Sequence, residues 1–595
     1  MRFVWAVAAF VLAAVMIASG VAQRTIFQGP KTETTSIASS DAASYTLIDG
    51  SVLGRRSGAQ TLRAAADGTV FAAYGRTADM KAWLSNTEYN DVTLKSDGSV
   101  KTDLVQPTDA SNQPQHRDPA GADLWLDEFQ QDDILIESLQ LPDTMSVLVA
   151  TNGTDPAPAD LSVTWSVRQS TPWAGPLIVG GGILMLVGVY LYILGIRKMR
   201  RSRGPRRKAL PPLPETEPID LSVEEADKGV ISAGTPAQAP TRRRRAFVAV
   251  PIALASALAF TGCSADAWPQ FGSSATPTPT ATVVDAGDTQ PPAVTTTQAD
   301  RILGRISKTI AQADEKKDAK LAATRLEGAP LAERKTNYTL RGKISGEAAL
   351  GALPTGGLKV VLPQAYEGWP RTVLLVADQK QDDAVVSTLM MISQSNPWSP
   401  YKLAYAGHLE AGSLPDVAPA YLGAAAVQPD SSFLVMPPAD IAAAYADVID
   451  KGDKSASAGQ FATDDDPFLK GVATKRKEQL AELAKTGKGT SKLTFAAASG
   501  PEQPLALATL ESGAIVAVNV HETETVKPTK QDAVIKLENN PRVKALTGVK
   551  ESQSGFTTTY TDQLFFYVPG VGSADAQIRL LGYSSNILGA KVTSK

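Results

Sequence analysis

The sequence predicts a multi-domain membrane protein with three hydrophobic membrane segments, an extracytoplasmic β-sandwich and two α+β regions in which helices lie on antiparallel sheets. Three observations predict this class. Apolar runs of about 20 residues are flanked by basic residues. Short alternating runs precede residue 174, and helical and strand patterns alternate after residue 299. A chain of 595 residues has room for several folded units.

Two apolar segments enclose the N-terminal region. Residues 3–22 follow a basic residue and are long enough to form a signal anchor, although small residues at their end leave a cleaved signal peptide as the alternative. Residues 176–196 are uncharged, and the basic run that follows marks the cytoplasmic side. Residues 25–174 are therefore expected outside the cytoplasm.

Three glycines in the second segment recur seven residues apart. Gly181, Gly188 and Gly195 fall on one face of a helix, where a partner helix could approach closely. Flexibility of a glycine-rich span is the alternative.

The third segment, residues 246–263, ends in the only cysteine of the chain. Four arginines precede it, about 15 apolar residues follow, and a small residue stands directly before Cys263. This pattern resembles the lipobox of bacterial lipoproteins, with Phe260 where leucine is usual. It implies lipid attachment at Cys263 and cleavage before it, whereas the alternative is a third membrane helix. Both interpretations place residues 264–595 outside the cytoplasm.

Two segments are predicted to connect the folded regions. Residues 197–245 combine a basic run with a stretch rich in Pro, Glu and Ala, which predicts a disordered cytoplasmic loop. Residues 264–298 are rich in Thr and Pro and predict a semi-extended tether that lifts a domain off the membrane.

The region between the first two segments is predicted to be β-rich. Its short apolar or alternating runs are bounded by Gly, Asp, Asn and Pro, which favours a small β-sandwich. The expected strands are residues 44–48, 69–74, 133–137, 145–150 and 161–167.

The C-terminal half shows the same order of patterns twice. Residues 299–425 begin with a helical repeat of Ile302, Ile306, Ile310 and Ala313 and continue with strand-like runs at 358–363, 371–377, 385–393 and 401–407. Residues 426–595 begin with helical patterns at 438–449 and 468–484. Further strand-like runs follow at residues 492–498, 504–511, 513–520, 556–568 and 577–583.

Helices cradled by a curved antiparallel sheet, twice over, resemble the cystatin-like cone of the nuclear-transport-factor-two-like superfamily. That fold serves binding proteins and enzymes alike, so the resemblance implies a fold and no activity. The whole layout resembles uncharacterised membrane proteins of high-GC Gram-positive bacteria (actinobacteria), in which a two-span membrane protein is joined to a lipoprotein.

Composition excludes several classes of chemistry. With 58 Lys and Arg against 61 Asp and Glu, the net charge of −3 gives no attraction to nucleic acid. One cysteine cannot form an intramolecular disulfide. The three histidines, His116, His408 and His521, are far apart in sequence. No metal site and no cofactor is therefore expected.

For two acidic clusters we prefer a structural interpretation to metal binding. The three aspartates at 464–466 precede a helix, so capping is favoured over a metal site for nucleotide sugars. A second cluster lacks the spacing of a calcium loop and is expected to be a solvated face. It comprises Asp123, Asp127, Glu128, Asp132 and Asp133.

The remaining candidates are aromatic side chains and one histidine. Trp369, Trp398, Tyr401 and Tyr405 could line the mouth of a cone-shaped pocket, with core packing as the alternative. His521 stands beside two glutamates, but no nucleophile can be assigned to it. The sequence contains no nucleophile elbow, Walker loop or paired CxxC, so no catalytic residue is predicted.

These observations favour a membrane-anchored extracytoplasmic binding or assembly factor of the bacterial cell envelope. Its expected partners are cytoplasmic membrane lipids and an envelope protein, glycan or lipid as ligand, with no nucleic acid. The alternative is an envelope enzyme that acts on wall glycans or lipids by glycosyl transfer or hydrolysis. A pocket with two ionisable groups within hydrogen-bonding reach would favour the enzyme, and an apolar pocket or patch would favour binding.

Overall fold

The computed structural model separates into two compact units, one with residues 1–33 and 166–283 and the other with residues 34–165 and 284–595. The third hydrophobic segment, Cys263 and most of both predicted connecting segments lie outside the residues that the structure describes. Those residues are 2–27, 30–38, 43–56, 59–107, 116–167, 171–201, 292–365, 368–381, 384–410, 414–487, 489–574 and 576–594.

The described elements before residue 202 are two long helices and a β-rich region with two short helices. They are α1 (Arg2–Thr25), β1 (Thr32–Ile37), β2 (Tyr45–Ile48), α2 (Gly50–Leu53), β3 (Gln60–Arg76), α3 (Thr77–Leu84), β4 (Tyr89–Leu94), β5 (Val100–Val105), β6 (Asp127–Leu139), β7 (Met145–Ala150), β8 (Asp160–Ser166) and α4 (Ala174–Arg201).

The described elements after residue 291 mix helices and strands. The first group is α6 (Thr296–Lys316), α7 (Ala319–Ala322), α8 (Gly328–Lys343), β9 (Leu358–Pro363), β10 (Arg371–Gln381), β11 (Ala384–Gln394) and β12 (Lys402–Leu409). The second group is α9 (Pro438–Lys451), α10 (Pro467–Thr486), β13 (Ser491–Ser499), β14 (Leu505–Ala508), β15 (Ala514–Pro528), β16 (Ile535–Lys536), α11 (Pro541–Thr547), β17 (Glu551–Ser552), β18 (Phe556–Val568) and β19 (Arg579–Val592). Three short 3₁₀ turns lie between α9 and α10.

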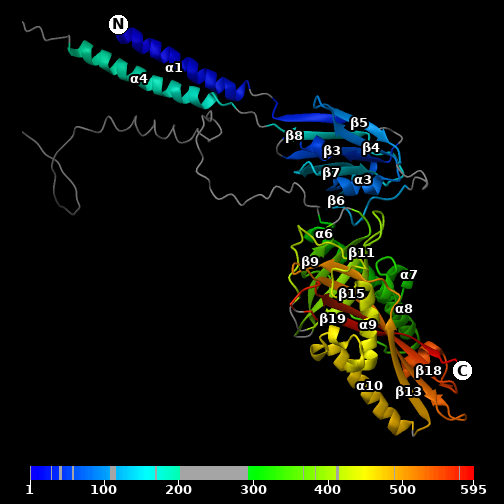
Figure 1. Ribbon diagram of the computed structural model, residues 1–595. Coiled ribbons are helices and arrows are strands. Elements are labelled where there is room, and N and C mark those ends of the chain that lie inside the picture. The colour runs from blue at the N-terminus through cyan, green and yellow to red at the C-terminus, as the bar shows by residue number, and fades with distance from the viewer. Residues whose placement is uncertain are drawn as a thin grey trace, which may run out of the picture. The chain divides into compact units, whose positions relative to one another are not determined.

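The helices α1 and α4 lie side by side (Figure 1), packed through small residues. A Cβ atom at Gly181 would lie 2.9 Å from the carbonyl oxygen of Ala13, and one at Gly188 would meet the ring of Phe10 at 3.2 Å. Glycine is therefore what lets the two backbones approach. The glycine face is the face on which a partner helix packs, and the partner is α1.

The helix α1 presents a matching row of small residues. Ala6, Ala13 and Gly20 are also seven residues apart, and all three are buried. Large apolar side chains on the other faces of both helices are exposed, among them Leu12 and Ile183. By length and composition, α1 and α4 could each cross a membrane.

The β region (residues 34–165) is built on one sheet with the strand order β1-β8-β3-β7-β2-β4-β5, and β6 pairs with β3. The 17-residue strand β3 pairs with β8 along its first part and with β7 along its second part. Leu62 from the first part and Val70 from the second belong to the same hydrophobic core. A single folded sheet thus supplies both walls of the sandwich-like core.

A second core lies on the other face of this sheet. Tyr45 and Phe71 from the strands pack with Trp83 of α3 and with Trp125. The rings of Trp83 and Trp125 lie 5.3 Å apart. Trp369, more than 200 residues later in the chain, packs against the same cluster.

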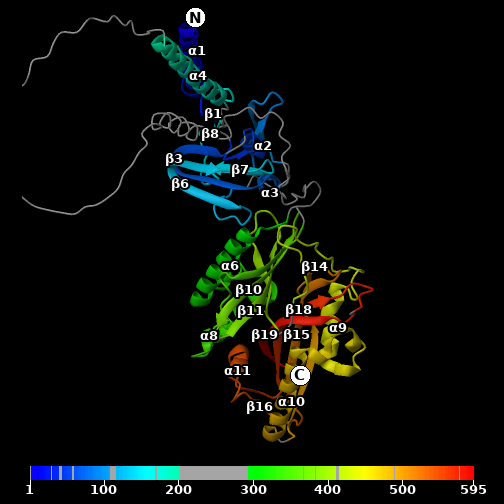
Figure 2. The ribbon, with the colours of Figure 1, turned by 90° about the vertical axis from the view of Figure 1, so that its left-hand side faces the viewer.

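The α+β region (residues 292–594) contains one nine-stranded sheet, with the order β13-β15-β18-β19-β12-β11-β10-β9 and β14 paired to β15. The two sequence repeats were expected to have a sheet each; instead they share this sheet. Figure 2 shows strands of both repeats, among them β10, β11 and β19. The halves join where His408 pairs with Tyr583 and Leu409 with Gly582. A Cβ atom at Gly407 would lie 3.0 Å from the backbone of Tyr583, so glycine permits the join.

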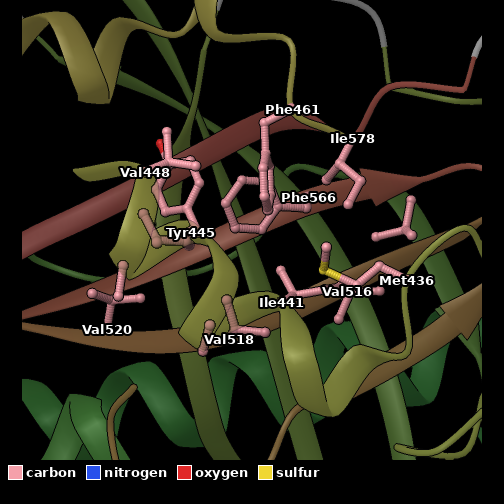
Figure 3. Packing of buried hydrophobic residues seen from close by; sticks show 14 of the residues in the cluster. Met436, Ile441, Tyr445, Val448, Phe461, Val516, Val518, Val520, Phe566 and Ile578 are labelled. Atoms are coloured by element: carbon pink, nitrogen blue, oxygen red, sulfur yellow. The ribbon is translucent and has the colours of Figure 1, made fainter. Parts of the chain in front are cut away.

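Helices cover the two halves of the sheet as the sequence predicts. The side chains of Ile302, Ile306 and Ile310 on α6 are buried in one core. In the other, the ring of Tyr445 on α9 lies 4.8 Å from that of Phe566 on β18 (Figure 3). The helix α6 begins three residues before the expected position 299, because Thr295 and Gln298 form a capping box.

Replacing Gly181 with leucine should push α1 and α4 apart, because even the first side-chain carbon would lie 2.6 Å from Cγ1 of Ile17. Overpacking of this kind costs about 1–3 kcal/mol. Gly182→Leu is the matched control, since nothing lies within 4 Å of a Cβ atom at that position.

Cross-linking of cysteines placed at Phe3 and Tyr192 with a short bis-maleimide measures this packing, since the rings of these two residues lie 5.5 Å apart between α1 and α4. In a Cys263→Ala background the yield should fall with Gly181→Leu and stay unchanged with Gly182→Leu. Equal yields in the two variants would show that the glycine face does not determine the packing.

Candidate functional site

Three of the four aromatic candidates lie where the β region meets the α+β region. Trp398 donates its Nε1–H to the carbonyl oxygen of Trp83 at 2.8 Å. The ring of Trp369 packs on the aromatic core of the β region. The backbone N–H of fully buried Tyr401 donates to Asp123 at 2.8 Å. The structure thus gathers these residues at a contact between regions, where Trp398 also lines a pocket of about 470 Å³ together with Trp83 and Arg117.

The other two candidates lie elsewhere in the α+β region. The buried hydroxyl of Tyr405 donates to the carbonyl oxygen of Gln503 at 2.7 Å, which is the satisfied core role of such a residue. His521 lies on β15, where partial burial lowers its pKa, although the charge of nearby Glu502 opposes that effect. The structure does not bring these two residues together with the first three.

Of the three aspartates before α10, Asp466 caps the helix as predicted, whereas Asp464 and Asp465 lie in a 3₁₀ turn. Asp466 accepts hydrogen bonds from the backbone N–H of Leu469 at 2.9 Å and from the hydroxyl of Tyr445 at 2.6 Å. It thereby holds the start of the helix against α9. Within the residues that the structure describes, no group of three or more His, Cys, Asp or Glu side chains could hold a metal ion.

The expectation of a solvated acidic face is wrong for Asp123. Its side chain is 0% exposed and is paired with Arg305, at 3.2 Å, and with Arg325. Glu128 pairs with the same Arg305 at 2.6 Å, whereas Asp132 is exposed. The arginines stand some 180 to 200 residues after the acidic cluster, so local sequence gave no sign of them.

A polar pocket of about 250 Å³ lies beside β19, where β12 no longer pairs with it. The helix α8 packs along β19 there. Thr336 donates to the carbonyl oxygen of Leu588 at 2.6 Å, and Asn586 donates its amide to Glu333 at 2.9 Å. The lining includes Asn337, Leu340 and Ser585 as well as Glu333 and Asn586.

Glu333 is the chemically distinctive group of this pocket. Burial disfavours its charged form and raises the pKa of its carboxyl to about 7, while the hydrogen bond from Asn586 partly offsets the rise. The carboxyl can therefore hold or release a proton near neutral pH. The sequence analysis did not single out Glu333, because it recognised no motif in residues 328–343. The spacing of Glu333 and Asn337, which share one helical face, was the available signal.

The far wall of the pocket carries charged groups that pair with one another. The ammonium of Lys475 lies 3.7 Å from the ring centre of Tyr560 and 2.9 Å from Glu524. Arg542 pairs with Glu347 at 2.8 Å. The positive charges are thus matched by carboxylates, and the pocket is polar without a strong net charge.

The α+β region as a whole is one domain, a helix-covered antiparallel sheet with a polar pocket at its join. This chain belongs to the family described as domain of unknown function (DUF8094), whose model matches residues 290–592 and so spans α6 to β19 with the pocket. Neither the curated proteins nor the solved structures contain a match to the chain.

Glu333 should make the folded protein less stable as the pH rises. Its pKa is about 7 in the folded protein against an ordinary value of 4.5, so its stabilising contribution is complete below about pH 4 and is lost as the pH rises through 7. The full loss corresponds to about 3 kcal/mol. Glu333→Gln stays neutral and should remove this part of the pH dependence.

Urea unfolding at about pH 5 and about pH 8, followed by tryptophan fluorescence, measures the difference. Asp562 is also buried, with a pKa raised to about 7 by desolvation and by the charge of Glu522, and acts in the same direction. The comparison is therefore between wild type and Glu333→Gln, with Asp562→Asn measured separately. An unchanged pH dependence in Glu333→Gln would contradict the raised pKa.

Proposed function

We propose that this protein is a membrane-anchored binding factor of the bacterial cell envelope. In this proposal α1 and α4 cross the cytoplasmic membrane, and residues 34–165 and 292–594 lie on its outer side. The antiparallel pairing of α1 and α4 is the observation that carries the proposal.

The antiparallel pairing of α1 and α4 places basic residues at one end of the helix pair and the connecting chain at the other. Gly20 of α1 lies against Ala174 and Ile178 of α4, so the chain between the helices leaves from one end. Gly195 lies against Phe3 at the other end, and α4 continues there into Arg197, Lys198 and Arg200. Basic residues favour the cytoplasmic side, which supports an outer position for the intervening β region.

The sequence of residues 246–263 supports the same side for the α+β region. Either a third membrane helix or a lipoprotein signal with lipid on Cys263 would return the chain to the outer surface. We retain lipid attachment at Cys263 as part of the proposal.

The pocket beside β19 supports a glycan unit as the ligand in preference to a protein or an acyl chain. Amides of Asn337 and Asn586, the hydroxyl of Ser585 and the carboxyl of Glu333 offer both donors and acceptors to a hydroxyl-rich molecule. A volume of about 250 Å³ suits one unit of a longer polymer.

Cysteine labelling in intact cells should reveal the topology. With Cys263→Ala, a cysteine at exposed Ser99 should react with a membrane-impermeant maleimide, because the β region lies outside. A cysteine at Met199, which is 58% exposed, should react only after lysis. The reverse pattern, or release of the protein from membranes by alkaline carbonate, would overturn the anchored arrangement.

Binding of glycan fragments, released enzymatically from purified cell wall, should depend on the pocket. Asn586→Ala should weaken binding by about tenfold, since a lost hydrogen bond of this kind is worth about 1.4 kcal/mol. Lys359→Ala is the control, because its exposed ion pair with Asp378 lies on β9, away from the pocket. Calorimetry measures both, and equal affinities would exclude the pocket as the binding site.

An envelope enzyme that acts on wall glycans or lipids is the second candidate. The raised pKa of Glu333 favours it, because a general acid needs a pKa near the working pH. Two ionisable groups within hydrogen-bonding reach of each other, Arg542 and Glu347 at 2.8 Å, also line the pocket. Cleavage of the same fragments by wild type and not by Glu333→Gln would decide for the enzyme.

A further inference from the structure

We propose that residues 34–165 and residues 292–594 bind each other through a complete interface, so that they stay together as a non-covalent complex when the chain between them is cut. The interface, called the junction below, consists of the contacts of residues 76–128 with residues 293–401. The proposal depends neither on the pocket nor on lipid attachment at Cys263.

One half of the junction is an ion pair removed from water. Arg371, the first residue of β10, donates to Asp79 of α3 at 2.6 Å, and these side chains are 1% and 3% exposed. Arg76 holds the other carboxylate oxygen of Asp79 at 2.8 Å. The guanidinium of Arg371 also stacks on Trp369, 3.9 Å from its ring centre. Separation of the regions would break the pair between Arg371 and Asp79 and leave Asp79 with Arg76 alone.

The second half is centred on Asp123. Its carboxylate accepts from Arg305, Arg325 and the backbone N–H of Tyr401, three donors from three places in the α+β region. Removing one partner of a buried pair typically costs about 3–5 kcal/mol, because the other charge stays buried without compensation. Asp123 therefore has both of its arginine partners in the α+β region, and Asp79 has one of its two there.

Backbone groups complete the junction. Gln298 donates to the carbonyl oxygen of Asp123 at 2.6 Å, and Arg301 donates to that of Leu126 at 2.8 Å and to that of Trp125. In the other direction Arg76 donates to the carbonyl oxygen of Ala293. Hydrogen bonds thus run both ways, as they do in an interface between separate proteins.

Apolar surface is buried beside these polar contacts. Trp369 packs into the core formed by Trp83, Trp125 and their neighbours. Arg117 of the β region lies 5.0 Å from the ring centre of Trp398. Buried aromatic and arginine side chains of this kind are the usual centres of binding energy in protein interfaces.

The segment that links the regions in the chain is not part of this set. The hydrogen bonds and ion pairs between the two regions given above all join residues 76–128 to residues 293–401, so these described residues form a junction of their own. Cleavage before Cys263 would then give a two-helix membrane protein carrying the β region and a lipoprotein carrying the α+β region, held together by the junction.

A cut within the linking segment tests the proposal on the full-length protein. A site for a specific protease is inserted between residues 273 and 289, with different affinity tags at the two ends. After solubilisation in detergent and complete cleavage, the C-terminal fragment should co-purify in equal amount with the N-terminal tag, also in high salt, because buried ion pairs are little screened. Loss of the C-terminal fragment in wild type would overturn the proposal.

Charge removal then shows that the junction is the cause. Asp79→Ala with Asp123→Ala should lower the retained fraction by about tenfold. Asp160→Ala is the matched control, since Asp160 is 60% exposed and pairs with Arg63 inside the β region. Resistance of both fragments to mild trypsin confirms that they stay folded. Should the double variant fail to fold, Trp398→Ala, which alters a partly exposed residue, replaces it, and full retention in the folded variant would overturn the proposal.

Discussion

A single carboxylate buried between two regions of the chain organises much of this molecule. The side chain of Asp123 has no exposed surface. It pairs with Arg305 of α6 and Arg325 after α7, and it accepts a hydrogen bond from the backbone N–H of Tyr401 before β12. Because a buried charge is tolerated only with such compensation, the start of the α+β region has one favourable placement against the β region. The aromatic packing around Trp369 and Trp398 forms beside it.

The pocket follows from a different constraint, the short join within the shared sheet. Since β12 pairs with β19 through two residue pairs, the two strands part beyond Tyr583, and α8 occupies the space between them. That placement buries Glu333 next to Asn586. The burial of Glu333, which raises the pKa of its carboxyl to about 7, thus follows from the strand order of the sheet. The pocket lies where the two sequence repeats meet.

Sequence reasoning was strong where a pattern is local. The strand expected at 371–377 is the core of β10, the helix expected at 438–449 is α9, and the seven-residue glycine spacing marks the face that contacts α1. Prediction from the sequence failed where the environment of a residue is set by residues far away in the chain. Nothing near Asp123 announces Arg305 or Arg325, so a buried ion pair looked like a solvated face. The single sheet depends on Gly407 and Gly582, which lie where β12 joins β19. The pocket depends on α8, for which the sequence analysis recognised no pattern.

The shared sheet has a consequence for how such a domain can be inherited. A fragment that ended between the repeats, near residue 425, would expose Leu389 and Met391, which share one hydrophobic core with Phe565 of the second repeat, and would invite aggregation. We therefore expect neither repeat to be stable alone in its present form. The family match, residues 290–592, covers the whole sheet without a break, as expected if the two repeats are inherited together.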